Sequence, residues 1–223
     1  KAEEAVSSSD LMVEEKAKVV LFSYWRSSCS WRVRIALNLK NIEYESRSVN
    51  LLKNEQNDDA YSSMNPNRLI PTLEIDGHSL TQSMAVIEYL DETRENPKLV
   101  PNDPYLRAVV RSQAQIIGCE IQPVANLRVM RLHGMEFKQE WAYHWIKLGF
   151  EALEKEVSKT AGKYCVGDEI SLVDILLVPQ IFNALRWGVD MNQFPTLRKI
   201  GKFLDEIPAF QEAHADKQPD AVL

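Results

Sequence analysis

The sequence predicts an α/β domain followed by an all-helical domain. Strand-like and helix-like segments alternate between residues 18 and 93, which is the pattern of an α/β unit. A stretch rich in proline and polar residues follows at 94–104, and the strong periodic patterns beyond it are helical. We therefore predict an α/β domain at 18–93, a linker at 94–104 and a helical domain at 105–223, with a loose extension at 1–17.

The first part of the α/β domain contains a strand, a loop, a helix and a second strand. The apolar run VVLFSY predicts a buried strand, and the turn-like letters RSSCS follow it. In WRVRIALNLK, Val33, Leu37 and Lys40 fall on one helical face, and Tyr44–Asn50 resembles another strand. A helix between two strands predicts that the strands are parallel.

The second part of the α/β domain ends in a hairpin and a helix. A polar helix or loop is predicted at Glu55–Ser63, and Asn65-Pro66 would end it. PTLEI and HSL flank Asp76-Gly77, which is a strong hairpin signal, and SMAVIEYLDE predicts the closing helix. The complete order of strands and helices is that of a thioredoxin-like domain.

Apolar stripes at helical spacing predict core helices in the second domain. The stripes are Trp141, Trp145, Leu148 and Ala152, and then Leu197, Ile200, Leu204 and Ile207. Ser171 and Asp174 form an S-x-x-D capping box, which predicts that a helix begins directly after Ser171.

Composition excludes several classes of partner. The chain of 223 residues has a formal net charge of −6, which argues against general nucleic-acid binding. The apolar run Ile175–Ile181 is too short to span a membrane. Cys29, Cys119 and Cys165 have no metal-ligand spacing and cannot all form disulfides, and residues 1–17 resemble no signal peptide. We therefore expect a soluble cytoplasmic protein.

The letters SSCS place hydroxyl groups and a thiol at the start of a helix, where the helix dipole favours a thiolate. Lowering a thiol pKa by about two units requires about 2.7 kcal/mol, which is on the scale of one charge-assisted hydrogen bond. Either Cys29 is itself a nucleophile or a serine hydroxyl activates an external thiol. Ser27 and Ser28 could also be simple helix caps.

RSSCSWRVRIALNLK closely resembles the signature of the zeta-class glutathione transferases, in which two serines and a cysteine precede an aromatic residue and R-V-R-I-A-L. The resemblance continues in NLLK, NPNRLIPTLEIDG, QSMAVIEYL, IQPVANL, GKYCVGDEISLVDILLVPQ and the terminal QPD. It implies a thioredoxin-like N-terminal domain, an all-helical glutathione transferase C-terminal domain, glutathione as cofactor and a homodimer.

The resemblance also implies the activity of the maleylacetoacetate isomerases. The glutathione thiolate would add to the cis double bond of maleylacetoacetate, and elimination after rotation would give fumarylacetoacetate. Small carboxylate electrophiles such as α-halo acids, and xenobiotics, are further implied substrates. The alternatives are a thiol oxidoreductase that uses Cys29, which lacks the second cysteine of a C-x-x-C pair, and a non-catalytic glutathione-fold binding protein.

Among the residues near the first helix, the resemblance assigns the catalytic serine to Ser27, whose hydroxyl would donate a hydrogen bond to the glutathione thiolate. Ser28 and Cys29 would line the same catalytic pocket, with Cys29 in a secondary role. Arg32 and Arg34 lie in the same motif and are expected to be structural.

Two further segments of the first domain match glutathione-binding positions. Ile70-Pro71 matches a cis-proline step whose preceding backbone pairs with the cysteinyl part of glutathione. Gln82 and Ser83 would hold the γ-glutamyl end at a helix start. Gln56 lies near a glutathione-contacting glutamine of the family, but the chain is two residues shorter there.

The helical domain supplies the remaining candidates. Gln122, Asn126 and Leu127 match positions that approach glutathione, and Arg128 departs from the family because a serine usually follows the leucine. Arg186 matches an arginine that would receive a substrate carboxylate. No metal site is expected, because the histidines are isolated and show no metal-ligand spacing. They are His78, His133, His144 and His214.

Overall fold

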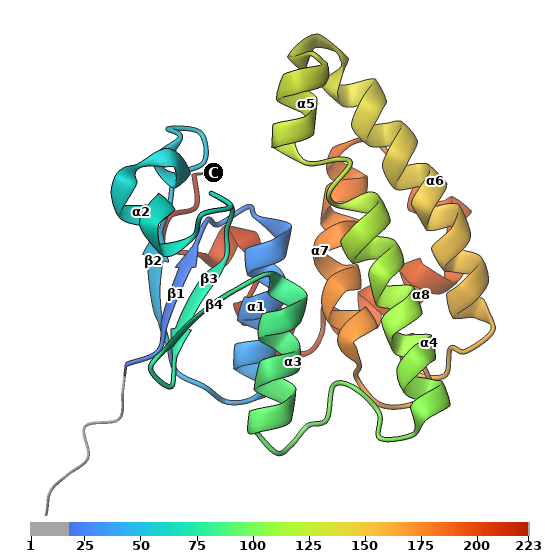
Figure 1. Ribbon diagram of the computed structural model, residues 1–223. Coiled ribbons are helices and arrows are strands. Elements are labelled where there is room, and N and C mark those ends of the chain that lie inside the picture. Colours follow the sequence, from blue (N-terminus) through green and yellow to red (C-terminus); the bar gives the residue numbers. More distant parts are fainter. Residues whose placement is uncertain (1–17, 223) are drawn as a thin grey trace, which may run out of the picture.

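A computed structural model describes residues 18–222, and in it a four-stranded sheet and its helices lie beside a bundle of helices (Figure 1). The predicted α/β part followed by an all-helical part is therefore confirmed as the fold class. The extension predicted at residues 1–17 lies outside the described residues. The exact domain boundaries stay a prediction.

The sheet has the strand order β2-β1-β3-β4. β1 (Val20–Ser23) pairs in parallel with β2 (Glu45–Ser48), and α1 (Ser28–Leu39) crosses between them, as predicted. β3 (Thr72–Ile75) pairs antiparallel with both β1 and β4 (His78–Thr81). The start of α1 therefore lies at the carboxyl end of the parallel pair, directly after β1.

The segments between these strands follow the sequence signals. The polar stretch forms the 3-10 turn η1 (Glu55–Asn57) and the short helix α2 (Asp59–Met64). Asp76 and Gly77 have φ of 53° and 76°, the left-handed conformation that a two-residue hairpin needs. α3 (Ser83–Thr93) closes the unit, and α1 and α3 lie between the sheet and the helical domain (Figure 1).

Helices account for the regular structure beyond α3, and the described residues contain no strand there. The main helices are α4 (Pro104–Gln115), α5 (Leu127–His133), α6 (Lys138–Ser158), α7 (Leu172–Arg186), α8 (Pro195–Leu204) and α9 (Pro208–Glu212). The short segments are the π-helical η2 (Ile116–Ile121) and the 3-10 turns η3 (Met135–Phe137), η4 (Met191–Gln193) and η5 (Ala215–Lys217). None of the described helices is long and apolar enough to cross a membrane.

The apolar stripe predicted for α6, which began at Trp141, is wrong: the buried face of the helix is shifted by about one residue. The buried side chains of α6 are Ala142, Ile146, Phe150, Leu153 and Val157. Leu148 is 49% exposed, and the indole N–H of Trp141 donates to the carbonyl of Val124 at 2.9 Å. Tryptophan has a polar N–H that needs a partner, so it lies at the edge of the core while smaller apolar residues fill the centre.

The stripe predicted for α8 is confirmed except at Ile207, which is half-buried and lies beyond the end of that helix, directly before α9. The capping box predicted for α7 is confirmed. Leu197, Ile200 and Leu204 are buried in α8. Asp174 accepts hydrogen bonds from the backbone N–H and the hydroxyl of Ser171, both at 2.8 Å, and α7 begins at the next residue, as the capping box predicts.

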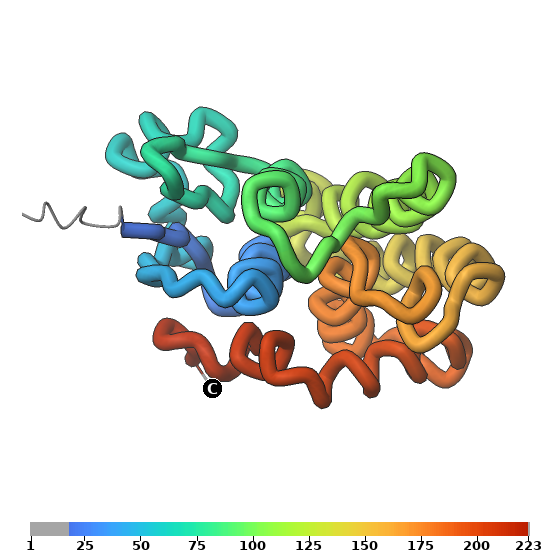
Figure 2. The backbone as a smooth tube through the Cα atoms, turned by 90° about the horizontal axis from the view of Figure 1, so that it is seen from below, coloured from blue at the N-terminus to red at the C-terminus, as the bar shows by residue number. Residues whose placement is uncertain are grey.

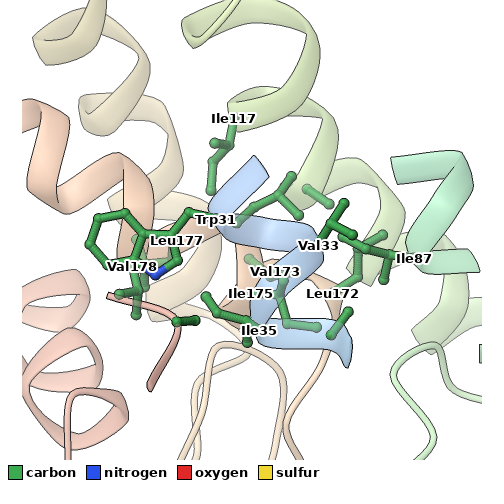
Figure 3. Packing of buried hydrophobic residues seen from close by; sticks show 14 of the residues in the cluster. Trp31, Val33, Ile35, Ile87, Ile117, Leu172, Val173, Ile175, Leu177 and Val178 are labelled. Carbon is green, nitrogen blue, oxygen red and sulfur yellow. The ribbon is translucent and has the colours of Figure 1, made fainter. Parts of the chain in front are cut away.

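A shared core joins the two domains through α1 and α7. Trp31, Val33 and Ile35 of α1 lie beside Leu172–Val178 of α7, and all of these α1 side chains are buried (Figure 3). The ring of Trp31 packs edge-on against Phe182 with a centroid distance of 5.3 Å. Because this interface is apolar and closely packed, it fixes the start of α1 relative to the helical domain.

The C-terminal segment crosses both domains (Figure 2). Arg34 donates to the carbonyls of Ala213 and Trp25 and to the hydroxyl of Ser23, and burial lowers its pKa to about 10. Asp220 accepts a hydrogen bond from the backbone N–H of Trp25 at 2.9 Å. These contacts hold the loop between β1 and α1 and give Arg34 the structural role that the sequence predicted.

Candidate functional site

The start of α1 provides a hydrogen-bond donor at a positive helix end. Ser27 is the N-cap, and its hydroxyl oxygen accepts the N–H of Ser30 at 3.2 Å. Because the oxygen is the acceptor in that bond, the hydroxyl proton is free to donate elsewhere. An anion that receives this proton also lies near the positive end of the α1 dipole.

Two cavities meet at this helix start. The first, which we call the arginine cavity, has a volume of about 290 Å³ and is lined by Ser27, Arg26 and Arg186. The second, which we call the cis-proline cavity, has a volume of about 330 Å³ and is lined by Cys29 and the Ile70–Pro71 step. Gln122 and Asn126 line both cavities, so these cavities are adjacent.

The cis-proline cavity has a peptide edge without hydrogen-bond partners. The Ile70–Pro71 bond is cis, and the backbone of Ile70 forms no hydrogen bond with another described residue. An extended peptide can pair with such an edge like an added strand. Gln82 adopts φ of 69° directly before α3, and Ser83 begins that helix. The two residues therefore bring a helix start to the same cavity.

The helical domain closes the opposite side of the cis-proline cavity. Gly118 in η2 lies against α3, where a Cβ would approach the sulfur of Met84 to 2.5 Å. A larger residue would force the side chain of Met84 to move. The π-helical turn also forms the i→i+5 bond from the N–H of Gln122 to the carbonyl of Ile117 at 3.0 Å. This turn positions Gln122 at the junction of the cavities.

Arg32 gives the cis-proline cavity an uncompensated positive charge. Its side chain is 2% exposed, and Nη1 donates to the hydroxyl of Ser83 at 3.3 Å. Nε and Nη2 have no hydrogen-bond partner among the described residues, and no Asp or Glu lines the cavity. A buried cation without a partner is costly, so the cavity favours an anionic ligand. Arg32 thus differs from Arg34, although both were expected to be structural.

The arginine cavity is also positively charged. Arg26, Arg186 and Lys138 line it, and no Asp or Glu does. The pKa of Arg186 is lowered, first because neighbouring atoms partly desolvate its guanidinium and second because the charge of Arg26 repels it. In a chain of net charge −6, two arginines close enough to repel each other favour a small anion.

All but one of the site residues predicted from the sequence line these cavities. Those of the arginine cavity are Ser27, Ser28, Gln122, Asn126, Leu127 and Arg186. Those of the cis-proline cavity are Cys29, Ile70, Pro71, Gln82, Ser83, Gln122 and Asn126. Gln56 is buried in η1 and lines neither cavity. Its glutathione contact stays a prediction that the geometry does not favour.

Sequence reasoning missed several cavity residues. Arg26 directly precedes the two serines, and its position there was the available signal. Lys138 and Gln180 reach the arginine cavity from α6 and α7, far along the chain, and no local motif marks them. The described residues contain no cluster of three or more His, Cys, Asp or Glu side chains that could hold a metal ion.

A thioredoxin-like sheet with a cis-proline edge, a serine at a helix start and a helical domain across the cavity define a glutathione transferase. Residues 26–93 match the family model described as glutathione S-transferase, N-terminal domain. The chain is 50% identical over 216 residues to the probable maleylacetoacetate isomerase 2 of Drosophila melanogaster, covering 96% of this chain and 92% of that protein. The chain belongs to the zeta-class glutathione transferases, the family of the maleylacetoacetate isomerases.

Solved structures agree with this assignment. A bacterial maleylpyruvate isomerase described as a zeta-class glutathione transferase superimposes with a TM-score of 0.88 at 37% identity, covering 91% of this chain and 100% of that one. A maleylacetoacetate isomerase from Anaeromyxobacter dehalogenans 2CP-1, with bound dicarboxyethyl glutathione and citrate in its active site, gives a TM-score of 0.83 at 40% identity. That match covers 92% of this chain and 98% of the other.

Proposed function

We propose that the protein catalyses the glutathione-dependent isomerisation of maleylacetoacetate to fumarylacetoacetate. The main support is the free donor of Ser27 at the start of α1, beside one cavity suited to a peptide and another suited to a small anion. Family membership supports the same reaction, since the relatives are named for it. The two alternatives, a thiol oxidoreductase that uses Cys29 and a non-catalytic binding protein, have no comparable support.

Glutathione fits the cis-proline cavity by its chemistry. The unpaired backbone of Ile70 suits the cysteinyl peptide unit, while Arg32 with Gln82 and Ser83 suits a carboxylate. When bound, glutathione supplies a thiolate that adds reversibly to the double bond of the substrate and so permits rotation. The residues of this chain hold the tripeptide and stabilise its charged sulfur.

We assign to Ser27 the hydrogen bond that stabilises the sulfur anion. Its hydroxyl oxygen is held in place by the N–H of Ser30, and its O–H remains available to donate to the sulfur. The N-terminus of α1 adds favourable electrostatics at the same point. Both effects lower the pKa of a bound thiol.

We propose that Arg26, Arg186 and Lys138 bind the carboxylates of the substrate. The bacterial relative holds a dicarboxyethyl derivative of glutathione and citrate in its active site, which supports recognition of carboxylates there. The same cations suit α-halo acids, so glutathione-dependent conversion of these compounds and a detoxifying role belong to the proposal. We further propose a cytoplasmic homodimer, as the family resemblance implies.

The proposed function is tested with purified protein and maleylacetoacetate. Chromatography should show fumarylacetoacetate only when glutathione is present, and S-methylglutathione, which has no free thiol, should inhibit its formation. Equal formation without glutathione, or none with it, would contradict the proposal.

A further inference from the structure

Arg128 is a second cation of the cis-proline cavity. It lies in the first turn of α5 and is exposed, and its Nη2 donates to the carbonyl of Asn67 at 2.6 Å. That bond is the single hydrogen bond of its guanidinium within the described residues. A guanidinium has five N–H donors in a planar fork, so the contact with Asn67 orients the group and leaves donors for a ligand.

The two cations of this cavity come from opposite domains. Arg32 reaches it from α1 and is held by Ser83, whereas Arg128 reaches it from α5 and is held by Asn67. Ile70, with its unpaired backbone, lies in the chain between the two residues that hold the arginines. The cavity thus offers a peptide edge and two separate counter-charges, with no acidic residue in its lining.

We propose that Arg128 binds the glycyl carboxylate of glutathione and makes this chain select the free acid. This inference rests on the proposed function, because it concerns the same ligand. Glutathione carries one carboxylate at each end. Arg32 with Ser83 and the N–H groups at the start of α3 suits the γ-glutamyl end, so the oriented fork of Arg128 is left for the glycyl end.

Arg131 provides a matched control for a purely structural role of Arg128. It lies one turn later on α5 and donates to Asn54 Oδ1 at 2.9 Å and to the carbonyl of Leu51 at 3.4 Å. Both arginines therefore tie α5 to the first domain, but Arg131 does not line the cis-proline cavity. Loosening α5 should affect ligands with and without the glycyl charge equally.

The test is calorimetric titration with glutathione and with its glycyl monoethyl ester, which lacks that carboxylate charge. Arg128→Ser should raise the Kd for glutathione about tenfold, the scale of one partly exposed charge-assisted hydrogen bond, and leave the Kd for the ester nearly unchanged. Arg131→Ser should change the Kd values for the two ligands by the same factor. Arg128→Lys, which keeps the charge but loses the fork, should fall between the native protein and Arg128→Ser.

Several outcomes would overturn the inference. Equal weakening of both ligands by Arg128→Ser would mean that Arg128 only fastens α5, as would native binding that does not distinguish acid from ester. If Arg128→Ser does not fold, Arg128→Lys must still discriminate between the ligands. If the native protein binds glutathione and its ester equally well, this inference alone is refuted. If the native protein binds no glutathione, the proposed function is refuted as well.

Discussion

The two halves of the proposed site are built differently. The thioredoxin-like half uses backbone features: the N-cap at Ser27, the cis bond at Ile70–Pro71 and the left-handed Gln82. The helical half uses long side chains, such as Arg186 and Arg128, that reach the cavities from separate helices. Backbone positions tolerate little change, while side chains can be exchanged. We infer that the first half holds and activates the common thiol, and that the side chains of the helical half, together with Arg26 of the first half, determine which carboxylates fit.

The largest expected effect concerns the first half. Ser27→Ala removes the hydroxyl at the start of α1, so turnover should fall by about 10- to 100-fold, the value of one charge-assisted hydrogen bond. Because every substrate uses the same thiol, kcat/KM should fall similarly for maleylacetoacetate and for an uncharged electrophile. A loss confined to one substrate would break the proposed division between the halves.

Arg186→Ala tests the second half. Removing this cation should reduce kcat/KM for maleylacetoacetate and α-halo acids, because a substrate carboxylate loses its counter-charge. The loss of transition-state stabilisation should be about 1–3 kcal/mol. Glutathione affinity should remain nearly unchanged, and a neutral electrophile should be affected less. Parallel kinetics with a dianionic and an uncharged substrate measure this. Equal losses would show that Arg186 supports packing and does not recognise charge.

Arg26→Ala should have a smaller effect of the same kind. Arg26 repels Arg186 and contributes to lowering the pKa of that residue, so its removal also relieves an unfavourable contact. We expect a loss of about tenfold or less on carboxylate substrates. A larger loss than that of Arg186→Ala, measured in the same paired kinetics, would assign the main counter-charge to Arg26.

The smallest expected effect is that of Cys29→Ala. Cys29 lines the cis-proline cavity but is not the proposed donor to the sulfur, so turnover should change by less than about threefold. If Cys29→Ala instead abolished a thiol–disulfide exchange activity and Ser27→Ala did not impair isomerisation, the oxidoreductase alternative would be favoured.

The sequence predicted the α/β half well because local signals determine it. Asp76-Gly77 can adopt the left-handed turn of a two-residue hairpin, and a serine before a helix is an effective cap. The stripe of α6 was misplaced because two apolar patterns of helical spacing overlap, and only packing shows that Ile146 and not Trp145 fills the core. Periodicity cannot distinguish two such patterns.

The site could be predicted in part for a related reason. Local motifs mark Ser27 and the Ile70-Pro71 step, whereas Lys138 reaches the arginine cavity through tertiary packing. Arg32 and Arg34 are two residues apart and both buried, and the sequence gives no reason to separate them. The structure does: Arg34 has three hydrogen-bond partners and Arg32 retains unpaired donors in a cavity.

The central claim is that the start of α1 stabilises a bound thiolate. It is tested most directly by titrating the ultraviolet absorbance of the glutathione thiolate on the native protein and on Ser27→Ala. We predict that the bound thiol of the native protein has a pKa about two units below the value of about 8.5 for a free thiol, and that Ser27→Ala raises it toward that value. A bound thiol that titrates as it does in water, or one unaffected by Ser27→Ala, would contradict the account.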